Sequence, residues 1–213
     1  MNHTTHETIV IRHAPTKSNE SARFMGTVDT PSTADGLAHA RALGDRLSVE
    51  DSVLLYTSPL QRSLETLKML RPGRSGLIDS RLRERDLGEW EGSLRKEVRV
   101  RRPDAFVRNG TLDPFVTPPG GESPESFIAR IGSFLEHLIE ANPNGKSLLV
   151  THNGVIAAMR ALTGGISLRE AFMEEEPFLS PRTLVVDSKA LRLDLSRVLT
   201  EIENSREGKL PSS

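Results

Sequence analysis

Two histidines stand at the ends of short apolar segments in this sequence. His13 follows TIVIR at 8–12, and His152 follows SLLVT at 147–151. Both segments are short, apolar and partly β-branched, which is typical of buried strands. Because ligands bind to open α/β sheets at the carboxyl ends of strands, two such histidines can meet in one crevice. Two unrelated structural histidines are the alternative, and the matched contexts count against it.

Two arginines extend this pattern. Arg12 directly precedes His13, and Arg62 lies in the first turn of a helix predicted to begin with SPLQ at 58–61, where serine and glutamine form a capping box. A cation at a helix N-terminus opposes the helix dipole by about 0.3–1 kcal/mol, and a bound anion would reverse that sign. A guanidinium fork also suits phosphate. The alternative is that Arg62 faces solvent.

Together these residues predict a cationic pocket for a phosphoryl group, with Asn19 and Thr30 as polar loop groups. A histidine in such a pocket can act as a nucleophile or as an acid and base. The sequence contains neither GxxxxGK[ST] nor HExxH, and its histidines have no compact metal-ligand spacing. We therefore expect no P-loop, no metal site and no cofactor.

Composition narrows the class of protein further. The chain has 213 residues, no cysteine and a net charge of −1. Without cysteine there are no disulfides and no thiolate chemistry, which fits a reducing compartment. The charge balance gives no support for binding to nucleic acid or an anionic membrane. No apolar run approaches the roughly 20 residues that span a bilayer. These features predict a soluble, cytoplasmic protein.

Strand and helix patterns alternate along the chain. They predict one α/β domain over 1–213, a three-layer sandwich with a central, mostly parallel sheet and helices on both faces. We expect a small lid insertion around 92–122 and frayed tails at 1–7 and 204–213. The patterns predict strands over 8–12, 52–57, 77–81 and 147–151, helices over 33–47, 58–70, 94–100, 124–141 and from 154, and a terminal hairpin of 183–187 with 190–195.

A series of short motifs runs through residues 8–165. They are RHAPTKSN at 12–19, GTVDTP at 26–31, SPLQR at 58–62, LRERDLGEWEG at 82–92, PGGES at 119–123 and THNGV at 151–155. Each alone is weak, but together and in this order they resemble the histidine phosphatase superfamily, in its phosphoglycerate-mutase-like branch.

That resemblance implies a role for each motif residue. His13 would be the nucleophile that forms a phosphohistidine, and one of its ring nitrogens should be held by a fixed acceptor so that the neutral imidazole can attack. Glu84 would protonate the leaving oxygen and then activate water, although from its charged neighbours alone it reads as part of a solvated face. Arg12, Arg62 and His152 would hold the phosphoryl oxygens, and Asn19 would donate to them.

Two positions depart from the family pattern. Ala14 replaces the glycine after the nucleophile, and Pro15 favours an extended backbone at Ala14 that alanine tolerates. Asn153 replaces the glycine after the second histidine, which places a side chain at the pocket. We count Asn153 and Thr30 among the predicted substrate-binding residues.

The remaining charged and histidine residues fit simpler readings. The run Glu174-Glu175-Glu176 is predicted to lie on the surface, and His6 in the N-terminal tail. The cluster that begins with Arg95 and Lys96 fits a solvated helix face, or else a rim that attracts anionic substrates.

The sequence therefore predicts a metal-independent phosphatase that hydrolyses small phosphate monoesters. The substrate would be a small phosphorylated metabolite, without nucleic-acid or membrane partners, and a homodimer is one option for its assembly. The short 92–122 segment favours hydrolysis over the mutase activity of relatives with longer insertions. The alternatives are a mutase-type phosphoryl transferase and a non-catalytic module that binds phosphorylated ligands.

Overall fold

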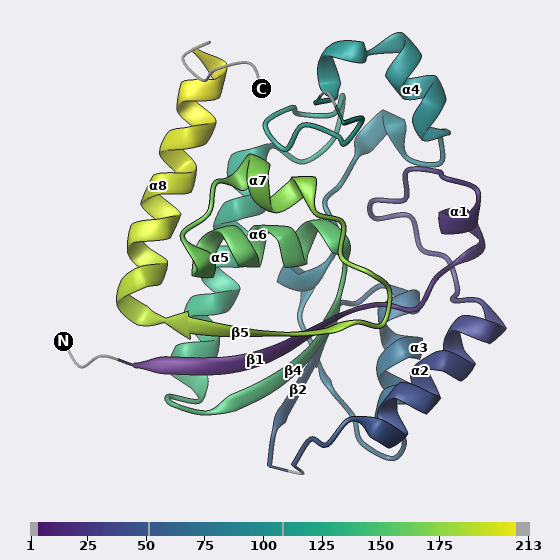
Figure 1. The fold of residues 1–213 in the computed structure, drawn as a ribbon, viewed down its shortest axis with the longest axis vertical. Coiled ribbons are helices and arrows are strands. Elements are labelled where there is room, and N and C mark those ends of the chain that lie inside the picture. The colour runs from purple at the N-terminus through teal and green to yellow at the C-terminus, as the bar shows by residue number, and fades with distance from the viewer. Residues whose placement is uncertain (1–3, 51, 108, 208–213) are drawn as a thin grey trace.

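The computed structural model describes residues 4–50, 52–107 and 109–207. In this part of the chain five strands form one sheet in the order β3-β2-β4-β1-β5. The first four strands run parallel and β5 is antiparallel to β1 at the edge (Figure 1). The strands are β1 (Thr5–Arg12), β2 (Leu54–Thr57), β3 (Leu77–Ile78), β4 (Lys146–Thr151) and β5 (Pro181–Asp187).

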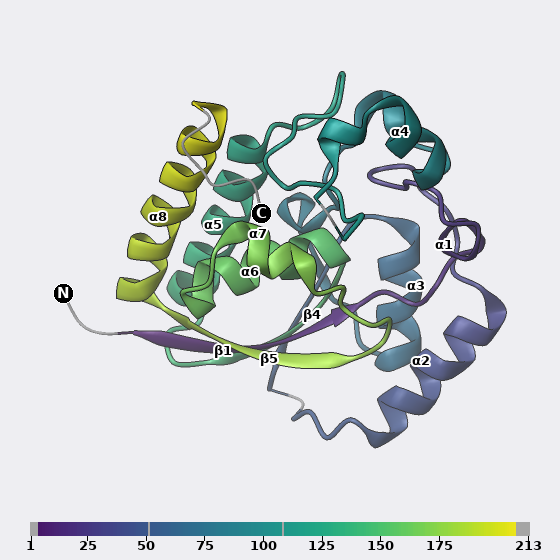
Figure 2. The ribbon, with the colours of Figure 1, turned by 45° about the horizontal axis from the view of Figure 1, so that its top comes forward.

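Helices cover both faces of the sheet (Figure 2). Successive strand residues point to opposite faces, so Val10 and Leu149 enter the larger core while Ile11 and Leu148 enter the smaller one. The predicted three-layer α/β architecture is confirmed. The smaller core lies against α2 (Ala34–Arg46) and α3 (Gln61–Leu70), and the larger against α5 (Pro124–Ala141), α6 (Asn153–Gly164), α7 (Leu168–Met173) and α8 (Ser188–Arg206).

The predicted terminal hairpin is wrong in its second half. Residues 188–206 form the single helix α8, and Asp187 caps it by accepting from the backbone N–H groups of Lys189 and Ala190, both at 2.9 Å. The alternation in ALRLDL imitates a strand. The buried face instead follows the helical spacing of Leu191, Val198 and Ile202, which pack into the larger core.

The predicted N-terminal tail is also shorter than expected. Strand β1 begins at Thr5, and His6 is fully buried. Its Nδ1 lies 3.0 Å from the carbonyl oxygen of Asn142 and its Nε2 lies 2.9 Å from Ser147 Oγ. At the other end α8 continues to Arg206. Residues 1–3 and 208–213 of the predicted tails lie outside the described residues.

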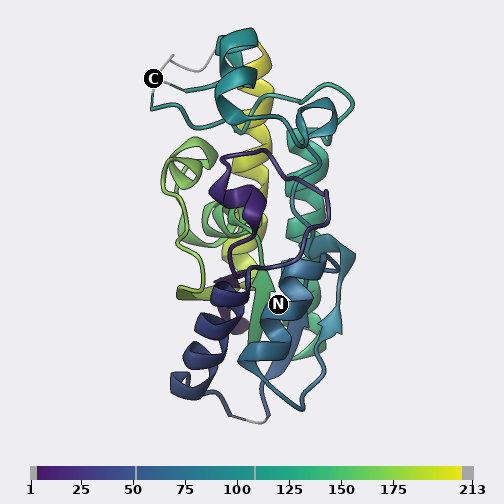
Figure 3. The same ribbon diagram turned by 90° about the vertical axis from the view of Figure 1, so that its right-hand side faces the viewer.

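The segments after the four parallel strands gather at one end of the molecule, whereas the antiparallel β5 leads into α8 at the opposite side (Figure 1). The chain between β1 and α2, which includes α1 (Lys17–Glu20), passes between α2 and α4 (Arg95–Arg101), as Figures 1 and 3 show. The strand predicted over 77–81 is shorter, because a 3-10 helix, Ser80–Leu82, follows β3. None of the helices in the described ranges combines the length and the apolar character that crossing a bilayer requires.

Candidate active site

The two histidines meet where β1 and β4 end. These strands are parallel and pair Arg12 with Thr151, and the His13 N–H donates to the Thr151 carbonyl at 2.9 Å. His13 and His152 therefore follow neighbouring strands at the same level. Their ring centroids are 5.1 Å apart, and both residues are buried.

His13 is fixed in one orientation. Its Nδ1 lies 2.7 Å from the carbonyl oxygen of Ala14, which can only accept, so Nδ1 carries the proton and Nε2 keeps its lone pair. Ala14 is itself held, because its N–H donates to Thr66 Oγ1 at 2.8 Å. Burial, together with the charges of Arg62 and Arg12, lowers the pKa of His13 to about 3. At neutral pH the imidazole is therefore neutral.

Arg12 is held by residues 174–179, which we call the strap. Its Nη1 donates to Glu175 Oε1 at 2.9 Å and to the carbonyl oxygen of Glu176 at 2.6 Å. The Phe178 ring stacks on the guanidinium, with its centroid 3.7 Å from Cζ. Glu176 is buried, so the prediction that 174–176 is only a surface run is wrong. The strap holds Arg12 through Nη1 and through one face of the guanidinium.

Arg62 is held by the loop 26–31. Its Nη1 donates to the carbonyl of Val28 and its Nη2 to the carbonyl of Gly26, both at 2.8 Å. Asp29 Oδ1 accepts from the Gln61 N–H at 2.7 Å and so satisfies the start of α3. This corrects the predicted capping box at 58–61, because the cap comes from a distant loop. Arg62 is buried and does not face solvent.

The Ser58 hydroxyl accepts from the Leu60 N–H at 3.3 Å and makes its shorter contact with His152. Ser58 Oγ lies 2.7 Å from His152 Nε2, and Ser63 Oγ lies 3.5 Å from the same nitrogen. His152 Nδ1 is buried and has no hydrogen-bond partner among the residues that the structure describes. Burial, with the charge of Arg62, lowers the pKa of His152 well below its ordinary value. This ring too is neutral.

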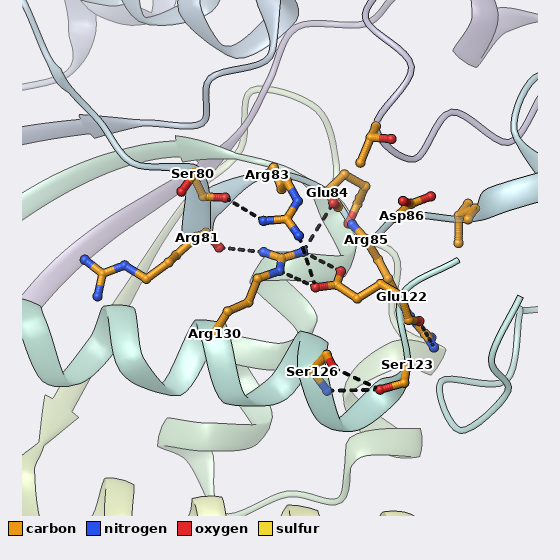
Figure 4. A network of polar contacts seen from close by, with 12 residues as sticks. Ser80, Arg81, Arg83, Glu84, Arg85, Asp86, Glu122, Ser123, Ser126 and Arg130 are labelled. Atoms are coloured by element: carbon orange, nitrogen blue, oxygen red, sulfur yellow. Dashed lines mark hydrogen bonds and ion pairs between the residues drawn. The ribbon is translucent and has the colours of Figure 1, made fainter. Parts of the chain in front are cut away.

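Glu84 is half-buried and lies against the start of α6. Its Oε1 accepts from the Arg85 N–H at 3.0 Å and its Oε2 from the Gly154 N–H at 3.2 Å. A Cβ at residue 154 would lie 2.6 Å from Glu84 Oε1, so this approach requires glycine. Arg130 donates to the Glu84 carbonyl at 3.2 Å and binds Glu122 at 2.7 Å (Figure 4). The carboxylate is thus positioned through both its side chain and its backbone.

Two asparagines border the same space with their oxygens already engaged. Asn19 Oδ1 accepts from the backbone N–H and the hydroxyl of Thr16, at 3.0 and 2.9 Å. Asn153 Oδ1 accepts from the Glu176 N–H at 2.8 Å. Each side chain therefore keeps its Nδ2 donors for another partner.

Most of the predicted site residues line one cavity of about 130 Å³. His152 is fully buried next to His13 and does not line the cavity. Thr30 is also outside it, and its buried hydroxyl has no partner in the described part of the chain. No group of three or more histidine, aspartate or glutamate side chains among the described residues is arranged to hold a metal ion. The predicted residues on the wall are Arg12, His13, Asn19, Arg62, Glu84 and Asn153.

Sequence reasoning missed several other residues of the cavity wall. Arg85 is buried and donates to the carbonyls of Pro114 and Val116, at 3.1 and 2.7 Å, so it ties the lid segment to the pocket. Its place beside Glu84 in a recognised motif was the available signal. Arg23, which was also missed, is exposed at the wall beside Arg95, a member of the basic cluster for which a rim was one of the two readings. The apolar wall residues include Phe24, Leu87, Leu112 and Phe172.

Comparison with known proteins agrees with this geometry. The family model of the histidine phosphatase superfamily (branch 1) matches residues 8–193. The chain belongs to this superfamily. The resemblance drawn from the six motifs is therefore confirmed, and the two histidines at the strand ends lie inside the matched region of a histidine phosphatase.

Three relatives show how far the similarity extends. Phosphoserine phosphatase 1 of Hydrogenobacter thermophilus is 32% identical, with 75% of this chain and 77% of the relative covered. Glucosyl-3-phosphoglycerate phosphatase of Mycolicibacterium vanbaalenii is 32% identical, with 74% of each chain covered. The structure of Bacillus stearothermophilus YhfR superposes with a TM-score of 0.74 at 30% identity, covering 84% of this chain and 90% of that one.

Proposed function

We propose that this histidine phosphatase is a metal-independent phosphatase that hydrolyses small phosphate monoesters through a phosphohistidine. The observation that carries the proposal is the state of His13. It is neutral, its Nδ1 proton is committed to the Ala14 carbonyl, and its Nε2 lone pair is free beside two buried arginines. A neutral nucleophile within a cationic cradle is what phosphoryl transfer needs.

The reaction proceeds in two balanced steps. His13 Nε2 attacks phosphorus and the P–O ester bond breaks, while the protonated Glu84 gives its proton to the leaving oxygen so that an alcohol departs. Glu84 then takes a proton from water, the resulting hydroxide attacks phosphorus, and the P–N bond breaks to release phosphate. Arg12 and Arg62 bind the phosphoryl oxygens, and Asn19 donates to them through Nδ2. His152, which was also expected to bind them, does not line the cavity and instead packs against His13, with ring centroids 5.1 Å apart.

The pocket and the relatives support a small, anionic substrate. The cavity is small, and exposed Arg23 and Arg95 stand on its wall, where they attract anions. The relatives' names specify a phosphoserine phosphatase and a glucosyl-3-phosphoglycerate phosphatase. A small phosphorylated metabolite is therefore the substrate we propose, with the segment 92–122 as a lid over it.

A mutase-type transferase would share the first step and differ in the second, since the phosphoryl group would pass to an alcohol instead of water. The short lid favours hydrolysis. A non-catalytic binding module would have no use for a fixed, neutral His13 with Glu84 beside it.

Turnover of an aryl phosphate in the presence of a chelator tests the proposal. We expect the wild type to release phosphate and to form an acid-labile phosphoenzyme, and His13→Ala to do neither while it still folds. Full turnover by His13→Ala, or no turnover by the wild type, would contradict the proposal.

The role of Glu84 needs substrates with different leaving groups. Glu84→Gln should slow alkyl phosphates by about 10²–10⁴-fold, because their leaving oxygen needs a proton. Aryl phosphates should be affected much less, because a phenolate leaves more readily. Equal losses on both classes would remove Glu84 as the general acid.

A further inference from the structure

Asn153 stands where the family pattern has glycine, directly after His152. It is the first residue of α6, and its side chain borders the cavity. Its Oδ1 does not face an open pocket, because it accepts from the backbone N–H of Glu176 in the strap, at 2.8 Å. Asn153 therefore joins the helix that follows the second histidine to a segment more than twenty residues further along the chain.

Glu176 is bound through both of its backbone polar groups. Its N–H donates to Asn153, and its carbonyl oxygen accepts from Arg12 Nη1 at 2.6 Å. One residue thus lies between the Asn153 amide and the guanidinium at the end of β1. The order of contacts is Asn153 Oδ1, Glu176 N–H, Glu176 carbonyl, Arg12 Nη1.

The side chain of Glu176 fastens this point of the strap. It is buried, with Oε1 at 3.2 Å from Arg160 Nη1 of α6 and at 3.0 Å from Arg182 Nε of β5. One residue before it, Glu175 is 62% exposed and is held only through its carboxylate on Arg12. Among these neighbours Glu176 is therefore the fixed point, and its carbonyl is a defined acceptor for Arg12.

We propose that Asn153 is a positioning residue for Arg12, acting through the backbone of Glu176. The inference rests on the proposed function, because it assumes that Arg12 binds the phosphoryl group. With Nη1 held by the strap and Phe178 against one face, the guanidinium is fixed where Arg12 borders the cavity. Loss of the Asn153 contact leaves the Glu176 side chain to anchor this point, so the Glu176 peptide can turn and its carbonyl becomes a less fixed acceptor for Arg12 Nη1.

The first experiment compares full-length wild type with Asn153→Gly, which restores the family residue and removes the acceptor. We expect Kd for inorganic phosphate, measured by calorimetry, and KM for an aryl phosphate to rise about tenfold, the size of effect for a hydrogen bond to a charged group. Asp187→Ala is the matched control. It removes the cap of α8, away from the cavity, and should lower thermal stability while phosphate binding stays unchanged.

The second experiment separates positioning from direct contact. Asn153→Gly is combined with Arg12→Met, and orthovanadate replaces phosphate as a tighter probe in all four proteins. If Asn153 acts through Arg12, its substitution should weaken vanadate binding in the wild-type background and have no further effect in the Arg12→Met background. An undiminished effect in that background would mean that Asn153 touches the ligand itself, and would overturn the proposal.

A ligand-free readout completes the test. The guanidinium NMR signals of Arg12 should show slowed rotation in the wild type and free rotation in Asn153→Gly. Unchanged Arg12 signals with wild-type phosphate affinity would also overturn the positioning role. Since phosphate binding and these signals need no turnover, absence of catalysis would reject the proposed function and leave this inference to be decided by its own measurements.

Discussion

The two arginines of the pocket are held in different ways. Arg62 donates to two neutral backbone carbonyls of the loop 26–31, and Glu91 secures that loop by accepting from the N–H groups of Thr27 and Val28, at 2.7 and 3.0 Å. Arg12 donates to one carbonyl and one carboxylate, and a phenyl ring covers its face. The direct acceptors of Arg62 are therefore uncharged, whereas one of the two acceptors of Arg12 is a carboxylate.

This difference assigns the arginines unequal electrostatic weight. Arg62 donates to uncharged carbonyls, and the carboxylates of Glu84, Asp29 and Glu91 act on it through space, whereas Glu175 binds Arg12 directly and offsets part of its charge. Solvent weakens that offset because Glu175 is largely exposed. Among the charges that lower the pKa of His13, Arg62 acts more strongly than Arg12. Of the two arginines, Arg62 therefore has the larger electrostatic effect on His13, and Arg12 the smaller.

The largest effect should come from removing the arginines singly. Arg62→Ala should reduce kcat/KM on an aryl phosphate by about 10³-fold and Arg12→Ala by about 10²-fold, the range seen when one oxyanion donor is lost. Arg62→Ala should also destabilise the fold, because two carbonyls lose their donor. Steady-state kinetics and thermal melts measure both. Equal losses for the two variants would remove the distinction drawn between them.

A shift in the pH profile should be the next largest effect. Under the proposed mechanism His13 attacks in its neutral form, so activity should be lost as pH falls through its pKa of about 3. Removing a neighbouring cation raises that pKa, and the acid limb should move to higher pH, further for Arg62→Gln than for Arg12→Gln.

The same pKa governs acid stability. Because folding lowers the pKa of His13, its contribution to stability is present above about pH 6.5 and is lost as pH falls toward 3. Denaturant titrations from pH 7 to 4 should therefore show a shallower loss of stability from this group in Arg62→Gln. If the acid limb of the pH–activity profile moves further in Arg12→Gln than in Arg62→Gln, the ranking of the two charges is reversed.

The smallest effect should come from Glu175→Gln, which leaves both arginines with uncharged direct acceptors. The amide oxygen can still accept from Arg12, so the geometry is kept while the charge is removed. Inorganic phosphate should then inhibit about two- to threefold more strongly, and the gain should shrink as salt is added. Weaker inhibition would show that the carboxylate positions Arg12 more than it opposes the bound anion.

The two segments that meet at Arg62 could be recognised in the sequence, although the contact between them was not predicted, whereas the strap that holds Arg12 could not be recognised, for a physical reason. The loop 26–31 and the α3 start contain glycine, proline and capping residues whose local preferences are visible in short motifs. The strap has no such pattern. Its glutamates form ion pairs with Arg12, Arg160 and Arg182, which lie on other elements of the fold. No regular spacing in the sequence connects these arginines with the glutamates.

The fold was also predictable in part from local sequence patterns. Buried strands and long helices are specified by periodicity over many residues, so the mostly parallel sheet and the helices on both of its faces agree with the expected architecture. The end of the chain was misread because six alternating residues outweighed a longer helical period. Ser58 was misread because its hydroxyl serves His152, a partner that the fold alone brings near.

The register between β1 and β4 decides which substitutions can alter the ligand that the cavity binds without moving the two histidines. The ladder that pairs Arg12 with Thr151 sets the spacing of the two histidines, so that spacing belongs to the buried sheet. The outer wall, with Leu112 from the 92–122 segment and Phe172 from α7, lies outside the sheet. Substitutions on this wall can therefore change which molecule fits the cavity while the two histidines keep their separation, whereas a slip of one residue in the ladder would change that separation whatever molecule is bound.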